Sequence, residues 1–352
     1  MNDPIDSQGP VLSDDQPPEP KKVKIPRSSW LHIVKSTIQR FTANQATDIA
    51  ATLTYYTVLA LFPGLLAIVS IIKLSGVGDR LMPELTRLIQ EGVPDDGTAQ
   101  TLVGIIDGFF SSSGAGFALV LGIITAVWAA SGYIAAFTRA MNRVHEVEEG
   151  RNAIKLKLFQ LLLTIIVLVS AVLVLGGLVL SGSVAQWVGD RIGLGNAVVR
   201  VWDIAKWPLL LALVMIVVAA LYHWTPNVKK PKFQPISPGS TLAVFIAIIA
   251  ATGFSFYAAN FGSYDKTYGT LAGVIIALWL LWLTNLALLV GAHLDEEIIR
   301  VRQLHRGMAA ERDPLLPPRE NAGIVKKQEK ANKLAAEAHQ IRMSADDKSD
   351  PA

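Results

Sequence analysis

Cysteine is absent from this chain of 352 residues. That absence excludes disulfides, thiolate nucleophiles, cysteine zinc sites and iron–sulfur ligation. Charge is also scarce, because Asp, Glu, Lys and Arg together make up 17% of the chain, whereas soluble domains carry roughly 25%. The formal net charge is only +3. The basic residues are scattered over several segments, so the concentrated basic face of a nucleic-acid-binding protein is missing.

Six stretches contain no Asp, Glu, Lys or Arg at all. They are Ile49–Ile72, Phe117–Thr138, Leu158–Gly189, Trp207–Val228, Phe233–Tyr264 and Thr267–Leu294. A transmembrane helix needs about 20 consecutive, mostly apolar residues, and each stretch is longer than that. The mean hydropathy of +0.39 agrees with lipid exposure. The sequence therefore predicts an all-α polytopic membrane protein with six transmembrane helices.

The charges between the six stretches alternate in character. Residues 21–40, 139–157, 229–232 and the segment after residue 294 are rich in Lys and Arg, whereas the connections between them are acidic, mixed or nearly uncharged. Lys and Arg accumulate in the cytoplasmic loops of membrane proteins. This alternation predicts that both termini are cytoplasmic.

The polar ends of the chain frame the membrane domain. Residues 1–29 are polar and rich in proline, which predicts a disordered cytoplasmic tail. Residues 30–300 form the predicted six-helix transmembrane domain, and residues 301–352 form a polar cytoplasmic tail. The domain opens with apolar residues at helical spacing, namely Leu31, Val34, Ile38 and Phe41. They predict an amphipathic helix, which either lies on the membrane surface or is an ordinary lead-in to the first span.

The loop after the first span is long enough to hold structure of its own. Leu81–Gln90 and Ala99–Phe110 each combine apolar and polar residues at helical spacing. We expect two short amphipathic helices there.

Polar residues in the first span are the first candidates for function, because polar side chains in a membrane are costly. Asp48, Thr52 and Tyr55 are spaced i, i+4 and i+7, so they share one helix face. Pro63 lies further along and frees a backbone carbonyl. This stripe predicts the lining of a cavity. The alternative is a polar contact between helices together with a packing kink.

Further polar residues fall at the same predicted depth, near the cytoplasmic ends of the second and sixth spans. Arg139 and Asn142 close the second span, and His293 and Asp295 close the sixth. Arg139 and Asp48 have opposite charges, which leads to the hypothesis of an ion pair at the inner mouth. In the alternative interpretation, Arg139 reaches lipid phosphates. The predicted substrate-binding or gating set is Asp48, Thr52, Tyr55, Pro63, Arg139, Asn142 and Asp295.

Two other polar features of the sixth span predict structural contacts. Asn285 is a lone amide at mid-depth, which is typical of a hydrogen bond between helices. Glu296 and Arg300 are spaced for an i, i+4 ion pair.

The sequence gives little support to an enzyme. The six histidines form no H-x-H or H-x-x-x-H pair, and neither a P-loop nor a G-x-S-x-G motif occurs. We therefore expect no catalytic residues, no metal and no cofactor.

Several of these residues occur together in an order that resembles the YihY/BrkB family of bacterial inner-membrane proteins, over roughly residues 35–300. The matching residues are Asp48, Thr52, Tyr55, Tyr56, Thr57, Leu61, Phe62, Pro63, Trp128, Ser131, Arg139, Ala140, Asn142, Arg143, Glu146, Tyr222, Pro226, Pro238, Gly239, Tyr268, Gly269, Thr270, Leu271, Gly291, Ala292 and Leu294. The resemblance implies a multi-pass protein of the bacterial cytoplasmic membrane with a role in envelope biogenesis. It also implies transport of lipids or lipid-linked precursors.

The resemblance carries an older ribonuclease label as well. RNA hydrolysis would need a metal or an acid–base constellation, and the sequence shows neither. The leading hypothesis is a transporter of lipid or lipid-linked solutes, and the alternative is a membrane scaffold that acts through its tails. The predicted partners are membrane lipids and a lipid or small-molecule substrate, without nucleic acid, and a homo-oligomer stays open.

Overall fold

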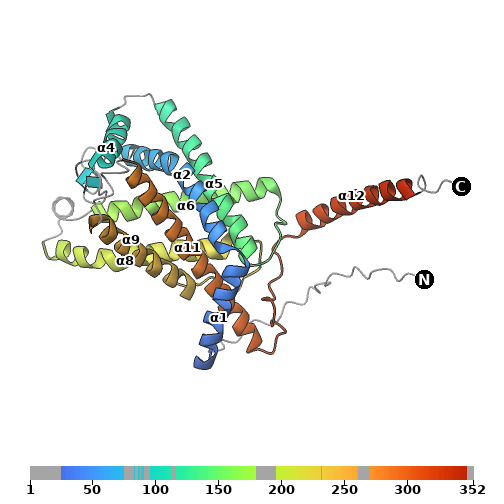
Figure 1. Cartoon of the computed structure of the whole chain (residues 1–352). Helices are drawn as coiled ribbons and strands as arrows, with labels where there is room; N and C mark the ends of the chain where they lie inside the picture. Colours follow the sequence, from blue (N-terminus) through green and yellow to red (C-terminus); the bar gives the residue numbers. More distant parts are fainter. Residues whose placement is uncertain are drawn as a thin grey trace.

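The structure is a computed structural model, shown in Figure 1. It describes residues 25–74, 83, 86–87, 89–90, 96–111, 116–179, 196–230, 232–260 and 270–346. This part of the chain is built from helices, which confirms the predicted all-α class. No strand occurs within these ranges, and an isolated bridge joins Val228 to Pro318.

Six long helices form the body of the molecule. They are α2 (Ala46–Leu74), α5 (Gly116–Val144), α6 (Ala153–Val179), α8 (Asn196–Trp224), α9 (Pro238–Asn260) and α11 (Thr270–Leu304). Each helix contains most of one charge-free stretch. Several extend beyond it because charged residues continue the helix past the apolar part, as Lys155 and Lys157 do in α6. α11 packs against both α9 and α2, α2 packs against α5, and α5, α6, α8 and α9 follow one another as neighbours.

Three of the described helices are long and apolar enough to cross a membrane. These segments are Ala153–Leu178, Val201–Trp224 and Val274–Leu304, and Pro238–Phe254 is a shorter apolar helix. The six spans and the orientation of the termini stay predictions.

All the long helices have one end in common, which we call the polar end. α2, α6 and α9 begin there, and α5, α8 and α11 end there. Hydrogen bonds show the common level: Asn142 near the end of α5 accepts from the backbone N–H of Asn227 just after α8, and Asp295 of α11 accepts from the N–H of Gly239 at the start of α9. The main apolar core lies beneath this level, and Leu53, Phe137 and Leu289 are fully buried in it. The chain therefore gathers its polar contacts at one end of an apolar bundle.

Deeper in the bundle, a single amide joins three helices. Asn285 of α11 accepts a hydrogen bond from the Tyr133 hydroxyl of α5 at 3.0 Å, and its Nδ2 lies 3.3 Å from the hydroxyls of Thr54 and Thr57 in α2. The predicted role of Asn285 as a hydrogen-bonding link between helices is confirmed.

The predicted N-terminal amphipathic helix is present as α1 (Arg27–Ala43). It packs against the end of α11 through the fully buried Ile33. Most of its predicted apolar stripe faces outward, because Leu31 is 80% exposed and Ile38 is 61% exposed, whereas Phe41 packs against the main core. An outward apolar face on a helix at the end of a membrane bundle is typical of contact with lipid.

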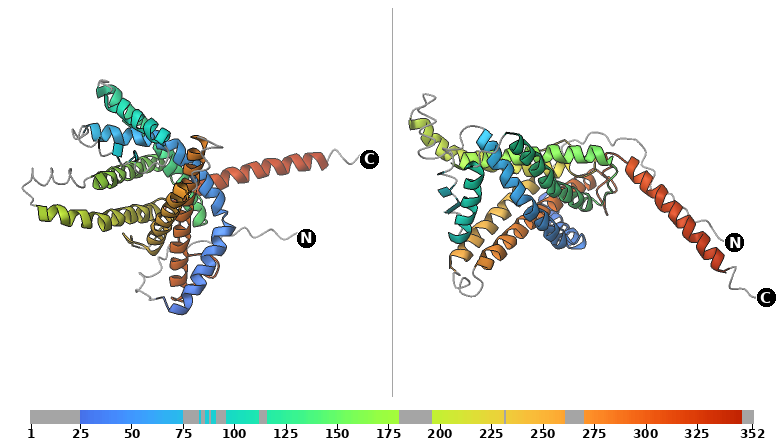
Figure 2. Two further views of the ribbon diagram at one scale, coloured as in Figure 1. Left: turned by 60° about the vertical axis from the view of Figure 1, so that its left-hand side comes forward. Right: turned by 90° about the horizontal axis from the view of Figure 1, so that it is seen from above.

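Two further helices lie outside the bundle. α4 (Asp96–Ser111) contains the predicted Ala99–Phe110 helix, whereas half of the residues in Leu81–Gln90 lie outside the described ranges. α12 (Ala322–Asp346) projects away from the body in every view (Figures 1 and 2).

The first part of the predicted C-terminal tail packs against the bundle. α11 continues to Leu304, and the residues that follow are tied to the polar end: Arg319 donates to the carbonyl oxygens of His223 and Val228, and the N–H of Gly323 donates to Gly150. In the described part of this tail, α12 is the segment that extends into solvent. Burying the carbonyls that follow a helix end requires hydrogen-bond donors, and Arg319 supplies them.

Candidate functional site

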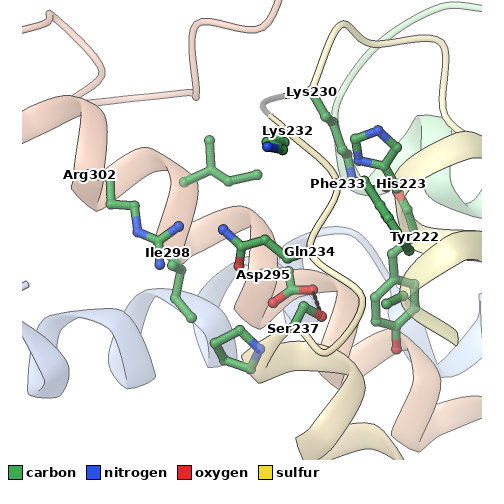
Figure 3. A pocket seen from close by; sticks show the side chains of 13 residues that line it. Tyr222, His223, Lys230, Lys232, Phe233, Gln234, Ser237, Asp295, Ile298 and Arg302 are labelled. Carbon is green, nitrogen blue, oxygen red and sulfur yellow. Dashed lines mark hydrogen bonds between the residues drawn. The ribbon is translucent and has the colours of Figure 1, made fainter. Parts of the chain in front are cut away.

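A pocket opens at the polar end, between the end of α8, the connection that follows it, and α11. Figure 3 shows Arg302 and Ile298 of α11 on one side and Tyr222 and His223 of α8 on the other. Its volume is about 70 Å³. Ligand pockets are roughly 300–1,000 Å³, so this is a small, open pocket that suits a compact group such as a phosphate rather than a whole lipid headgroup.

Positive charge dominates the lining of this pocket. Lys230, Lys232 and Arg302 contribute three cations from two segments far apart in the sequence. Asp295 is the only carboxylate among the lining residues, and it is already engaged: it accepts hydrogen bonds from the Ser237 hydroxyl and, at 2.7 Å, from the backbone N–H of Gly239. The pocket therefore offers unbalanced positive charge to a ligand.

The contact of Asp295 also explains how α9 begins. The first N–H groups of a helix have no partner within the helix, and a carboxylate near them is favoured by the helix dipole. Asp295 fills this role from a neighbouring helix. The predicted site residue Asp295 thus lies at the pocket and fixes the geometry of one wall.

Lys230 is held in place at the back of the pocket. Its Nζ donates to the carbonyl oxygen of Tyr222 at 2.6 Å. Burial lowers the pKa of Lys230 to about 8, while the charges of Asp295 and Glu296 oppose that shift. Lys230 therefore remains mostly cationic at neutral pH, and its hydrogen bond to Tyr222 holds the charge in position.

One wall of the pocket is aromatic. Phe233 stacks on Trp224 with ring centroids 4.9 Å apart, and it meets the His223 ring edge-on at 5.4 Å.

A second polar cluster lies beside the pocket and joins three segments: the end of α5, the loop that follows it, and the segment after α8. Asn142 accepts from the backbone of Asn227 at 2.7 Å and donates to Glu149 at 2.9 Å. Two nitrogens of the Arg151 guanidinium donate to the Glu149 carboxylate, at 2.8 and 2.7 Å. Arg151 also donates to the carbonyl oxygen of Thr225. Burial raises the pKa of Glu149, but the hydrogen bonds from Arg151 and Asn142 outweigh it, so this pKa lies below its ordinary value.

This cluster places the predicted site residue Asn142 in a structural contact. Both sides of its amide have protein partners, which hold the end of α5 to the segment after α8. Asn142 is buried and does not line the pocket. The sequence reasoning singled out Asn142 but missed Glu149, Arg151 and Asn227, because the contact depends on segments up to 85 residues apart.

The predicted stripe of the first span lies elsewhere. Asp48, Thr52 and Tyr55 do share one face of α2, but that face is exposed, and Tyr55 is 60% exposed. The Thr52 hydroxyl donates to the carbonyl oxygen of Asp48. Pro63 lies inside α2, which runs unbroken to Leu74. None of the four residues lines the pocket.

The hypothesis of an ion pair between Asp48 and Arg139 is wrong. Within the described residues no ion pair joins them, and the Arg139 guanidinium lies over the ring of Tyr56, 5.4 Å from its centroid. Both side chains are exposed. The predicted i, i+4 pair of Glu296 with Arg300 is also wrong, because Arg300 binds Glu297 instead, at 2.7 Å.

The sequence did carry a signal for the cations of the pocket. The short connection with Lys229, Lys230 and Lys232 is conspicuously basic, and we interpreted it as a topological signal. Lys and Arg can both mark a cytoplasmic loop and line a binding pocket. Only folding brings Arg302 of α11 beside Lys230 and Lys232.

Comparison with known proteins agrees with this architecture. Residues 37–315 match the family described as Virulence factor BrkB. The chain belongs to this family. The match includes all six long helices, the pocket and most of the segment that packs after α11.

Individual relatives extend the comparison. A putative ribonuclease-like protein, YfkH of Bacillus subtilis, is 27% identical over 78% of this chain and 98% of its own length. A UPF0761 membrane protein of Haemophilus influenzae is 26% identical over 73% of this chain and 91% of its own length. One from Alkalilimnicola ehrlichii is 28% identical over 74% of this chain but only 56% of its own length. No solved structure matches the chain. These relatives support a bacterial membrane protein of the BrkB/UPF0761 family.

Proposed function

We propose that this BrkB-family protein crosses the bacterial cytoplasmic membrane six times, with the polar end and both termini on the cytoplasmic side. The charge-free stretches and the basic connections at residues 139–157 and 229–232 support this orientation. The pocket then lies at the inner surface of the membrane, where the headgroups of anionic lipids gather.

At that place, the pocket binds the phosphate of a lipid or lipid-linked solute and contributes to its transport during envelope biogenesis. The observation that carries this proposal is the trio Lys230, Lys232 and Arg302 around a space whose only carboxylate already caps α9. Lys and Arg are the side chains that bind phosphate through charge-assisted hydrogen bonds. The same pocket is also lined by apolar side chains, namely Ile298, Ile299 and Phe233. These side chains would contact the acyl chains of a bound lipid.

The test replaces Lys232 and Arg302, the two pocket cations for which the described residues show no hydrogen bond. The double variant Lys232→Gln and Arg302→Gln is expected to bind phosphatidylglycerol roughly 10- to 30-fold more weakly, since each cation near an anionic lipid surface contributes about 1 kcal/mol. The measurement is a binding titration of purified protein in detergent, with phosphatidylcholine as the neutral lipid.

The matched control removes the same charges nearby but outside the pocket lining, with Lys229→Gln and Arg312→Gln. This control is expected to retain wild-type binding. Equal losses in the two double variants, or equal affinity of the wild type for both lipids, would contradict the proposed pocket.

The alternative function, a scaffold that acts through its tails, rests on α12. This helix stands clear of the bundle, and most of its residues are exposed (Figure 2). Deleting residues 325–352 separates the two functions, because the deletion leaves the Gly323 contact and the pocket intact. A lipid-binding protein should keep its affinity for phosphatidylglycerol, whereas a scaffold should keep its fold but lose its cellular phenotype.

The ribonuclease in the name of the Bacillus relative belongs to that protein. In the part of this chain that the structure describes, no three His, Asp or Glu side chains gather in a way that could hold a metal ion. That this chain is not an enzyme stays a prediction.

A further inference from the structure

Two neighbouring glutamates of α11 are both buried but have opposite surroundings. Glu297 accepts from Arg300 at 2.7 Å and from the Nε of Arg40 at 2.7 Å. The side chain of Glu296 is only 1% exposed, and neither of its oxygens has a hydrogen-bond partner within the described residues. Glu297 is therefore a satisfied structural carboxylate, and Glu296 is not.

The nearest group to Glu296 comes from another helix. The Nδ1 of His145, in the turn that follows α5, lies 3.6 Å from Oε1 of Glu296. His145 is as deeply buried, and neither of its ring nitrogens has a hydrogen-bond partner in the described part of the chain. Four buried polar atoms thus lack a hydrogen bond, and two of them, His145 Nδ1 and Glu296 Oε1, are separated by a distance just beyond one.

A bare carboxylate in such a place is costly, because burial removes water without supplying any donor. One proton shared between the carboxyl and the ring removes the net charge, and a small approach of the two side chains then completes an O–H···N hydrogen bond. We propose that His145 and Glu296 form a buried proton-binding site that joins the end of α5 to α11.

The groups around the pair are consistent with one shared proton. Burial, and then the charge of Lys230, hold the pKa of His145 well below its ordinary value, so the ring is a neutral acceptor for the proton on Glu296. Charged and titratable groups of every packed element act on the pair: Arg40 of α1, His293 of α11, Lys230 of the connection after α8, Asp313 of the segment after α11, and Glu146 beside His145. Glu297 follows Glu296 in α11 and is neutralised by Arg40 and Arg300. Arg40 is already bound to Glu297, and Lys230 to the Tyr222 carbonyl, so neither cation neutralises Glu296 directly.

The site is separate from the pocket, because neither His145 nor Glu296 lines it. The inference therefore goes beyond the proposed lipid binding and stands without it. Loss of the proton places a bare negative charge between α5 and α11, which weakens this joint. Gain of the proton restores it. A proton can thus control how tightly the two helices are held together.

The experiment reads the proton on Glu296 directly. Infrared difference spectra of the purified full-length protein between about pH 5 and about pH 9 are expected to show the C=O band of a protonated carboxylic acid, which disappears as the pH rises. Glu296→Gln should abolish this band, and the matched variant Glu311→Gln, at an exposed position of the same charge, should leave it unchanged. The thermal midpoint of the wild type should fall as the pH rises through the same range, and that fall should be reduced in Glu296→Gln, since glutamine imitates the neutral form.

The absence of any band that depends on Glu296, or the same pH dependence of the midpoint in the wild type and in Glu296→Gln, would overturn the site. If Glu296→Gln does not fold, His145→Gln supplies the second test. Removing the ring should shift the pH at which the wild-type band is lost, and an unshifted band would equally reject the pair.

Discussion

Replacing Gly291 with alanine is expected to destabilise the protein by about 3 kcal/mol, at the upper end of what overpacking costs. A Cβ at this position would collide with the carbonyl oxygen of Gly239, and would lie 2.8 Å from both the Ala243 Cβ and the Tyr222 hydroxyl. The nearest of these is backbone, which no rotamer change can move. The joint between α9 and α11 must open, and with it the contact of Asp295 that shapes the pocket.

Thermal unfolding in detergent, together with the fraction of monodisperse protein after purification, measures this loss. Gly253→Ala is the matched control in α9, because a Cβ there meets nothing within 4 Å. In a helix interior alanine is about 1 kcal/mol more favourable than glycine, so the control should be neutral or slightly stabilising. Similar behaviour of the two variants would show that α9 and α11 are not so closely packed.

The second large effect is expected at Glu297. Glu297→Gln should cost about 3 kcal/mol, because removing one partner from a buried ion pair leaves uncompensated charge. Here two guanidiniums lose a buried negative partner: Arg300, whose side chain is 5% exposed, and Arg40, at 15%, which keeps only the more exposed carboxylates of Asp313 and Glu146. Arg40 belongs to α1, so the variant also loosens the hold of this helix on α11.

The adjacent residue provides the control. Glu296→Gln makes the same chemical change one position along α11, but within the described residues Glu296 forms no ion pair with an arginine, and its nearest charged or titratable contact is His145 at 3.6 Å. We expect a cost of about 1 kcal/mol or less at neutral pH. A large loss at Glu296 and a small loss at Glu297 would reverse the assignment of which carboxylate holds the end of the bundle together.

The apolar part of the fold could be predicted from the sequence, since it depends on short-range composition. Each charge-free stretch became a long helix, the amphipathic segments near residues 30 and 100 became α1 and α4, and Asn285 became a link between helices. These helices form because backbone N–H and C=O groups in an apolar environment must pair within their own segment. The family also followed from residues whose order in the sequence is itself the signal.

The candidate site could be predicted only in part. Asp295 does reach the pocket, but Asp48, Thr52 and Tyr55 lie on an exposed face of α2. Helical spacing tells which residues share a face, and it does not tell toward which neighbour that face turns. The ion pair expected between Asp48 and Arg139 failed for this reason: their matched depth along the bundle did not place them at the same position around it.

The sequence by itself determined a helical membrane protein of the BrkB family, with its charges collected at the ends of apolar helices. Only the tertiary structure decided which of those charges meet. Arg300 forms its ion pair with Glu297 and not with Glu296, and Asp295 caps the N-terminus of α9. Arg302 lines the same pocket as Lys230 and Lys232. The physical reason is that the strength of a buried contact depends on distances of a few ångströms between segments tens to hundreds of residues apart. Such distances are set by how the helices pack, and no local pattern along the chain records them.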